Sequence, residues 1–238
     1  MSNFFHTIFY VPIETSLMFF YHLTGDNLGY AVILLTITIR LILIPLTIPS
    51  LRSAQKMQVI KPELDELKRR HGKDPQRMQK EQLDLYKKHG INPATGCLPI
   101  LLQLPILIFL YNVLTNVLKS DVVNPMFFIF NLREPDQYFI LPVLAAVSQF
   151  ILSFMMSPVP GKKDVQKEKK EADFADSLTG ALQTQNLYVM PLLWFFMLLK
   201  LPSGIGIYWV FSTIFSFVQQ WIFIGPGRLT TIFNRKKS

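Results

Sequence analysis

Polar side chains recur at a fixed spacing inside two stretches of the chain that are otherwise apolar. The positions are i, i+4 and i+11, occupied by Thr36, Arg40 and Thr47 in one stretch and by Tyr208, Ser212 and Gln219 in the other. Residues at this spacing share one face of a helix. An arginine at the centre of a membrane helix costs about 2.5 to 3.5 kcal/mol to insert, so Arg40 needs water or a polar partner there.

Neutral polar residues are the partners that the apolar stretches offer to Arg40. The apolar stretches of the chain, these two and the others, contain no Asp or Glu. Their further polar residues include Gln103, Tyr111, Ser148, Gln149, Trp209 and Gln220. We therefore predict that Arg40 lies in a water-filled cavity lined by polar helix faces. Two alternatives stay open. In the first, each neutral polar group only forms a hydrogen bond that holds two helices together. In the second, Arg40 lies on a tilted helix and its side chain snorkels to the membrane surface.

The sequence lacks the common motifs for catalysis and metal binding. It contains no G-x-x-x-x-G-K-[ST] loop, no H-E-x-x-H and no G-x-S-x-G, and its four histidines lack metal-ligand spacing. The single cysteine, Cys97, excludes an internal disulfide and a metal site built from cysteines. We therefore predict a protein that is not an enzyme and that uses no metal and no cofactor.

The composition is that of an integral membrane protein. Half of the 238 residues are apolar and only 17% are charged, compared with about a quarter in soluble domains. A transmembrane helix needs about 20 mainly apolar residues. Five segments qualify: Leu28–Ser50, Cys97–Leu118, Tyr138–Met156, Thr184–Leu201 and Gly204–Ile224. We predict an all-α membrane protein with five transmembrane helices, the first at 28–50 and the other four within 97–224.

The basic residues predict how these helices are oriented. Of the 24 Lys and Arg residues, 11 lie between Leu51 and Thr95, five in residues 157–183, and four after Ile224. The segments on the opposite side contribute only three. By the positive-inside rule, the N-terminus lies outside and the C-terminus lies in the cytoplasm.

The charged segment 51–95 predicts two helices. Apolar residues recur every three or four positions in its first part, which places them in one stripe of a long helix that can bend at Pro62. Gly72 ends this helix, and Asp74 caps a second one that begins at Pro75. Two such helices should pack as an antiparallel hairpin that projects into the cytoplasm.

Three further segments lie outside the predicted spans. Residues 1–27 are apolar but interrupted by polar residues and Pro12, which favours an amphipathic helix in the outer interface over a sixth span. Residues 157–183 are polar and evenly charged, which predicts a flexible cytoplasmic loop. Residues 225–238 form a basic cytoplasmic tail that anionic lipids would attract.

Three ordered blocks of the sequence carry a resemblance to a known family. They are Thr36–Leu46 around Arg40, Gly90–Pro93 followed by Gly96–Ile106, and Pro202–Trp209 followed by Ser212 and Gln219. These blocks resemble the arginine-bearing first core span, the entry to the next span and the final span of the YidC family of membrane protein insertases, which has mitochondrial and chloroplast relatives. The resemblance covers the chain from about Asn27 to Ile224, and it is to a short bacterial form without a large extracytoplasmic domain.

The resemblance implies a function and a place in the cell. Members of the YidC family hold a hydrophilic groove inside the bilayer, open to the cytoplasm and to lipid but closed outside. The matching groove residues here are Arg40, Gln149 and Trp209, with Thr36, Gln103, Tyr208 and Ser212 as further lining. The resemblance also implies the bacterial plasma (inner) membrane, nascent membrane proteins as clients, and ribosomes, the signal recognition particle machinery and the general secretion channel as partners.

Two other functions fit the residues themselves. One is a passive folding chaperone or assembly scaffold, which would bind inserted helices on faces rich in Met and Phe without moving any segment across the membrane. The other is a channel for small solutes.

Overall fold

The fold is mainly helical in this computed structural model, which describes residues 6–71, 74–92, 98–120, 123–157 and 185–227. The elements are η1 (His6–Tyr10), α2 (Val11–Leu23), α3 (Leu28–Val59), α4 (Lys61–His71), α5 (Pro75–Lys88), α6 (Leu98–Lys119), β1 (Met126–Phe127), β2 (Phe130–Asn131), α7 (Ile140–Met155), η3 (Gln185–Val189), α9 (Met190–Leu198) and α10 (Ser203–Phe223). The η elements are single π-helical turns. The loop predicted at 157–183 lies outside these ranges after Ser157, and the tail lies outside them after Gly227.

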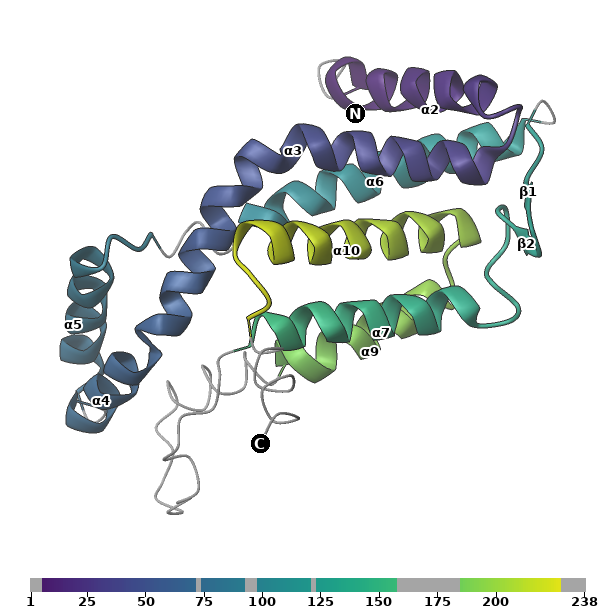
Figure 1. The fold of residues 1–238 in the computed structure, drawn as a ribbon. Coiled ribbons are helices and arrows are strands. Elements are labelled where there is room, and N and C mark those ends of the chain that lie inside the picture. Colours follow the sequence, from purple (N-terminus) through teal and green to yellow (C-terminus); the bar gives the residue numbers. More distant parts are fainter. Residues whose placement is uncertain (1–5, 72–73, 93–97, 121–122, 158–184, 228–238) are drawn as a thin grey trace.

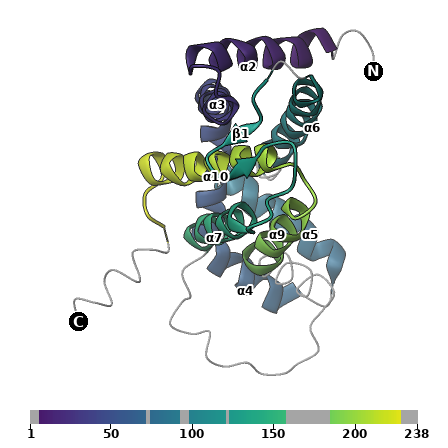
Figure 2. The ribbon, with the colours of Figure 1, turned by 90° about the vertical axis from the view of Figure 1, so that its right-hand side faces the viewer.

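The long helices lie in layers around α10 (Figures 1 and 2). Helix α2 covers α3 and α6, α10 lies beneath these two, and α7 and α9 form the opposite side. Glycines let the start of α10 approach its neighbours closely. A Cβ on Gly204 would lie 2.5 Å from Cδ2 of Leu114, and one on Gly206 would lie 3.1 Å from Cβ of Leu141. This packing makes α10 the central helix, in contact with α3, α6, α7 and α9.

Three helices of the described residues are long and apolar enough to cross a membrane, namely α3, α6 and α10. The helices inside the other two predicted spans are shorter, with 16 residues in α7 and nine in α9. Helix α7 begins only at Ile140 because Phe139 before it adopts a left-handed conformation, with φ 58°. Helix α9 follows the π-helical turn η3 and has a proline in its first turn.

Helix α3 continues beyond Ser50, where the first span is predicted to end, as far as Val59. It bends in its second half (Figure 1), where Pro45 and Pro49 each remove a backbone hydrogen-bond donor. The helix ends at Val59, before Pro62. Pro62 lies instead in the first turn of α4, where a missing N–H costs no helical hydrogen bond.

Helices α4 and α5 pack against each other at the end of α3 that lies away from α2 (Figure 1). Nε2 of His71, at the end of α4, lies 3.1 Å from Oε2 of Glu81 in α5. Nε2 of His89, just after α5, lies 3.1 Å from Oε2 of Glu63 at the start of α4. The first contact joins the end of α4 to the middle of α5, and the second joins the end of α5 to the start of α4, so the two helices run antiparallel.

The predicted cap of α5 is confirmed, because the side chain of Asp74 accepts a hydrogen bond from the backbone N–H of Arg77 at 3.1 Å. Replacing such a cap by alanine costs about 1 kcal/mol. Asp74→Ala should therefore loosen the first turn of α5 and speed hydrogen exchange at the amide of Arg77. Asp84→Ala, which changes an exposed carboxylate of the same helix, is the control and should leave this exchange rate unchanged.

Helix α2 crosses α3 obliquely, since Figure 2 views α3 nearly end-on while α2 extends along the plane of the picture. Its buried residues are Leu17 and Tyr21, and Phe19 and Leu23 are exposed. A helix with 13 residues is shorter than a membrane span requires. The position of α2 in the outer interface stays a prediction.

Candidate functional site

A hydrogen-bonded polar network joins α3, α6 and α10 through Arg40. The guanidinium donates from Nε to Oγ of Ser212 at 2.8 Å and from Nη2 to Oε1 of Gln103 at 3.0 Å. A second bond runs from Nη2 to the same Ser212 oxygen. Gln103 in turn donates from Nε2 to the hydroxyl of Tyr208 at 2.8 Å. The network therefore brings together four of the seven predicted groove residues.

A second link between α3 and α10 lies two turns further along both helices. Gln219 donates from Nε2 to Oγ1 of Thr47 at 2.6 Å. Thr47 and Gln219 are 172 positions apart in sequence, which is the same separation as between Arg40 and Ser212. A constant separation requires that the two helices run parallel and in register. The equal spacing of polar residues in the two stretches thus corresponds to one polar seam between α3 and α10.

The other three predicted groove residues are not hydrogen-bonded to this network within the described residues. Thr36 is buried one turn before Arg40 and donates to the carbonyl of Val32 on its own helix. Gln149 is half-buried on α7, and its Nε2 lies 3.5 Å from Oγ of Ser153. Trp209 is buried, and its ring stacks on that of Trp194 in α9.

Trp209 belongs to a second polar face of α10, which points toward α7 and α9. Gly206, Trp209, Thr213 and Gln220 share this face by helical periodicity, and Gly206 approaches Leu141 of α7. Two buried polar atoms of the described residues lack a hydrogen-bond partner, namely Nε1 of Trp209 and Oε1 of Gln220. Both lie on this face. It therefore differs from the α3 seam, where the polar groups satisfy one another.

Sequence reasoning left several of these residues out of the predicted site. Thr47, Gln219 and Gln220 were visible as polar residues in apolar stretches, but nothing in the sequence shows that the first two bond while Gln220 retains an unpaired atom. Ser153 carries a usable signal, since it stands four positions after Gln149 and so on the same helix face. Trp194 lies in an apolar run and carries no such signal.

Arg40 is half-buried, and within the described residues its hydrogen-bond partners are the neutral side chains of Ser212 and Gln103. Ion pairs in the described ranges include His22 with Asp26 and several pairs among α4, α5 and the adjoining His89. Those ranges also contain no group of three His, Cys, Asp or Glu residues placed to hold a metal ion. The positive charge of Arg40 is thus held by hydroxyl and amide dipoles.

Comparison with known proteins relates this arrangement to a family. Residues 19–227 match the family described as 60Kd inner membrane protein. The chain is 33% identical to the membrane protein insertase MisCA of Bacillus subtilis, over 90% of this chain and 77% of MisCA. It is 36% identical to the membrane protein insertase YidC of Wolinella succinogenes, over 91% of this chain and 37% of that protein. For YidC of Campylobacter jejuni the identity is 34%, over 85% of this chain and 35% of the relative.

The chain therefore covers most of the length of MisCA but little more than a third of these two YidC proteins. Its matched region includes α3, α6, α7, α9 and α10, and hence the whole polar network. A family match over this length agrees with the three helices that can cross a membrane. The chain is a multi-pass membrane protein that belongs to the 60Kd inner membrane protein family, the family of the YidC and MisCA membrane protein insertases.

Proposed function

We propose that this chain inserts client membrane proteins into the bilayer and helps them fold, through a hydrophilic, positively charged groove open to the cytoplasm and to lipid. The observation that carries the proposal is Arg40, which is held among three helices by partners that are all neutral in the described part of the chain. The insertase names of its relatives support the same function. The groove residues are Arg40, Gln149 and Trp209, with Thr36, Gln103, Tyr208 and Ser212 as lining.

The groove acts by lowering the free energy of moving a polar client segment through the membrane. Moving an amide or hydroxyl group from water into hydrocarbon without a hydrogen-bond partner costs about 4 to 8 kcal/mol on the cyclohexane scale. Water in the groove and the unpaired atoms of Trp209 and Gln220 offer such a segment hydrogen-bond partners. Acidic segments are also attracted to Arg40. The membrane potential, negative inside, drives them outward by about 2.3 kcal/mol per charge per 100 mV.

The proposed topology has five spans, with the N-terminus outside and the C-terminus in the cytoplasm. The parallel register of α3 and α10 supports it, because the first and last of five alternating spans run in the same direction. In a Cys97→Ser background, Gln137→Cys should react with an impermeant thiol reagent added outside intact cells. Lys88→Cys should react only after the cells are opened. Labelling of both from the same side would contradict this topology.

The cytoplasmic parts receive the client in this proposal. The antiparallel helices α4 and α5 carry many charges at the cytoplasmic end of α3, where ribosomes, the signal recognition particle machinery or the general secretion channel could deliver nascent membrane proteins. The basic tail, with Arg228, Arg235, Lys236 and Lys237, would also attract anionic lipids of the inner membrane. The proposed insertion displaces solvent and cleaves no bond, so in this proposal the chain is not an enzyme.

Reconstitution of the pure protein in liposomes with a short client that has an acidic tail tests the function. An insertase protects the client tail from added protease. A scaffold or passive chaperone binds the client and leaves its tail cleavable, and a solute channel leaks a trapped dye without any client. Either of the last two results would replace the proposed function.

A further inference from the structure

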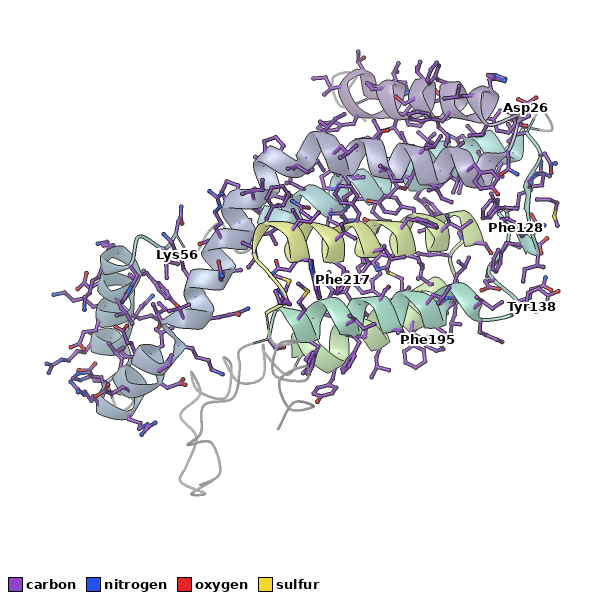
Figure 3. The ribbon with its side chains drawn as sticks, in the orientation of Figure 1. Asp26, Lys56, Phe128, Tyr138, Phe195 and Phe217 are labelled. Carbon is purple, nitrogen blue, oxygen red and sulfur yellow. The ribbon has the colours of Figure 1, made fainter. Side chains whose placement is uncertain are left out.

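Exposed apolar side chains gather at the end of the molecule where α3 begins. They come from the ribbon of β1 and β2 and from the residues before α7, and we call them the loop ridge: Met126, Phe128, Ile129, Tyr138 and Phe139. Phe128 is 75% exposed and Tyr138 63% exposed. Figure 3 shows both at the end of the molecule that also carries Asp26, away from α4 and α5. In water, such a cluster of large apolar side chains would be unfavourable.

The backbone holds this ridge in a fixed shape. Phe128 and Phe139 have φ values of 51° and 58°, a left-handed conformation that bulky residues rarely adopt. The ribbon pairs Phe127 with Phe130, which turns Phe128 outward between them. Phe127 is buried against the start of α3, where a Cβ on Gly29 would lie 2.1 Å from its ring. The exposed aromatic side chains are thus presented by a tightly packed support.

The ridge continues an exposed apolar surface of α7. Exposed apolar residues follow one side of α7 at helical spacing: Ile140, Val143, Leu144, Val147 and Ile151. The opposite side of α7, with Leu141 and Ala145, is buried in the bundle. Tyr138 and Phe139 extend the exposed stripe directly past the first residue of the helix. Ile129 and Tyr138 also line one cavity of about 210 Å³, so the ribbon and the start of α7 form a single surface.

We propose that the loop ridge inserts into the membrane interface at this end of the bundle, which is the outer leaflet in the proposed topology. Aromatic side chains are favoured at the boundary between headgroups and acyl chains, and interfacial elements insert about 5 to 10 Å into it. Because the ridge is continuous with the exposed apolar side of α7, in a chain that is a membrane protein, lipid is the occupant that fits this surface. The ridge thereby fixes how deep the end of the helices sits in the bilayer, whether or not the chain inserts clients.

Fluorescence quenching in liposomes tests the proposal on the full chain. Phe128→Cys in a Cys97→Ser background carries a fluorophore that senses polarity, and Glu134→Cys is the control, an exposed charged position of the same loop. We expect iodide in the buffer to quench the probe at 128 about threefold less than the probe at 134. Lipids with a nitroxide near the headgroup should quench the probe at 128 more than lipids with a nitroxide at the chain end.

Ile129→Cys repeats the measurement at a neighbouring ridge position without the left-handed backbone of Phe128, and it should give the same pattern. Equal iodide quenching at ridge and control positions would overturn the proposal, because the ridge would then lie in water. Protection that arises only after a client is added would also overturn it, since the surface would then bind clients. These outcomes are separate from the insertase assay, which measures protection of the client tail.

Discussion

Arg40→Ala is expected to lower insertion of a client with an acidic tail about tenfold or more, and to affect a neutral-tailed client much less. The reason is the attraction between the guanidinium and a client carboxylate. Unit charges 4 Å apart attract by about 4 kcal/mol at an effective dielectric constant of 20, and a loss of about 1.4 kcal/mol already corresponds to a factor of ten. The measurement is the fraction of tail protected from protease for two clients that differ only in tail charge.

Arg40→Glu should be worst for the acidic client, while Arg40→Lys separates charge from geometry. A lysine keeps the positive charge, but a single ammonium group cannot reproduce the two nitrogens through which Arg40 binds Ser212 and Gln103. If a diffuse positive potential is sufficient, Arg40→Lys should retain most of the insertion of acidic clients. Loss of activity in this variant as severe as in Arg40→Ala would show that the hydrogen-bonded fork is needed.

Thermal unfolding of the same variants provides the control for structure. Arg40→Ala removes a cation that has no acidic partner among the described residues, and Gln103 keeps its bond to Tyr208. Removing the cation also removes its desolvation cost, which offsets the lost bonds to Ser212 and Gln103, so the variant should unfold near the temperature of the unaltered protein. Equal loss of insertion for both clients would contradict charge recognition by Arg40, and an unfolded alanine variant would assign it to helix packing.

The sequence predicted which faces of the helices would carry the polar groups, but it did not predict which groups would pair. Helical periodicity is local, so the spacing of Arg40 and Thr47 was enough to put them on one side of α3. Pairing depends on how deep and at what rotation α10 sits against α3. Close contacts with other helices, such as Gly204 against Leu114 of α6, help to set the position of α10 in the bundle, and they join parts of the chain that no local pattern connects.

Helix lengths were predicted least well, for a related reason. The apolar run starting at Tyr138 continues through Phe139 without a residue that normally ends a helix, yet α7 begins one residue after this left-handed phenylalanine. Asp136 accounts for that start, since its carboxylate accepts hydrogen bonds from the backbone N–H of Tyr138 and of Leu141. A side chain placed before an apolar run can therefore shorten a helix that hydropathy alone extends.

Neighbouring glutamines on α10 should respond in opposite ways to the same substitution. Gln219 donates a hydrogen bond to Thr47, so Gln219→Leu should lower the free energy of unfolding by about 1 to 2 kcal/mol. Gln220 has a buried Oε1 without a partner, and such an atom costs about 1 to 3 kcal/mol. Gln220→Leu should therefore raise the unfolding temperature or leave it unchanged. Thermal unfolding in one detergent measures both variants.

Insertion assays on the same pair show which polar face of α10 serves the client. Gln220 shares the face toward α7 with Trp209, where polar atoms are left unpaired, whereas Gln219 belongs to the satisfied seam with α3. If clients use the unpaired face, Gln220→Leu should insert a polar-tailed client several-fold less well while being at least as stable as the unaltered protein. A stable Gln220→Leu variant with full activity would exclude this face as the client path, because no loss of folding could then mask a functional role.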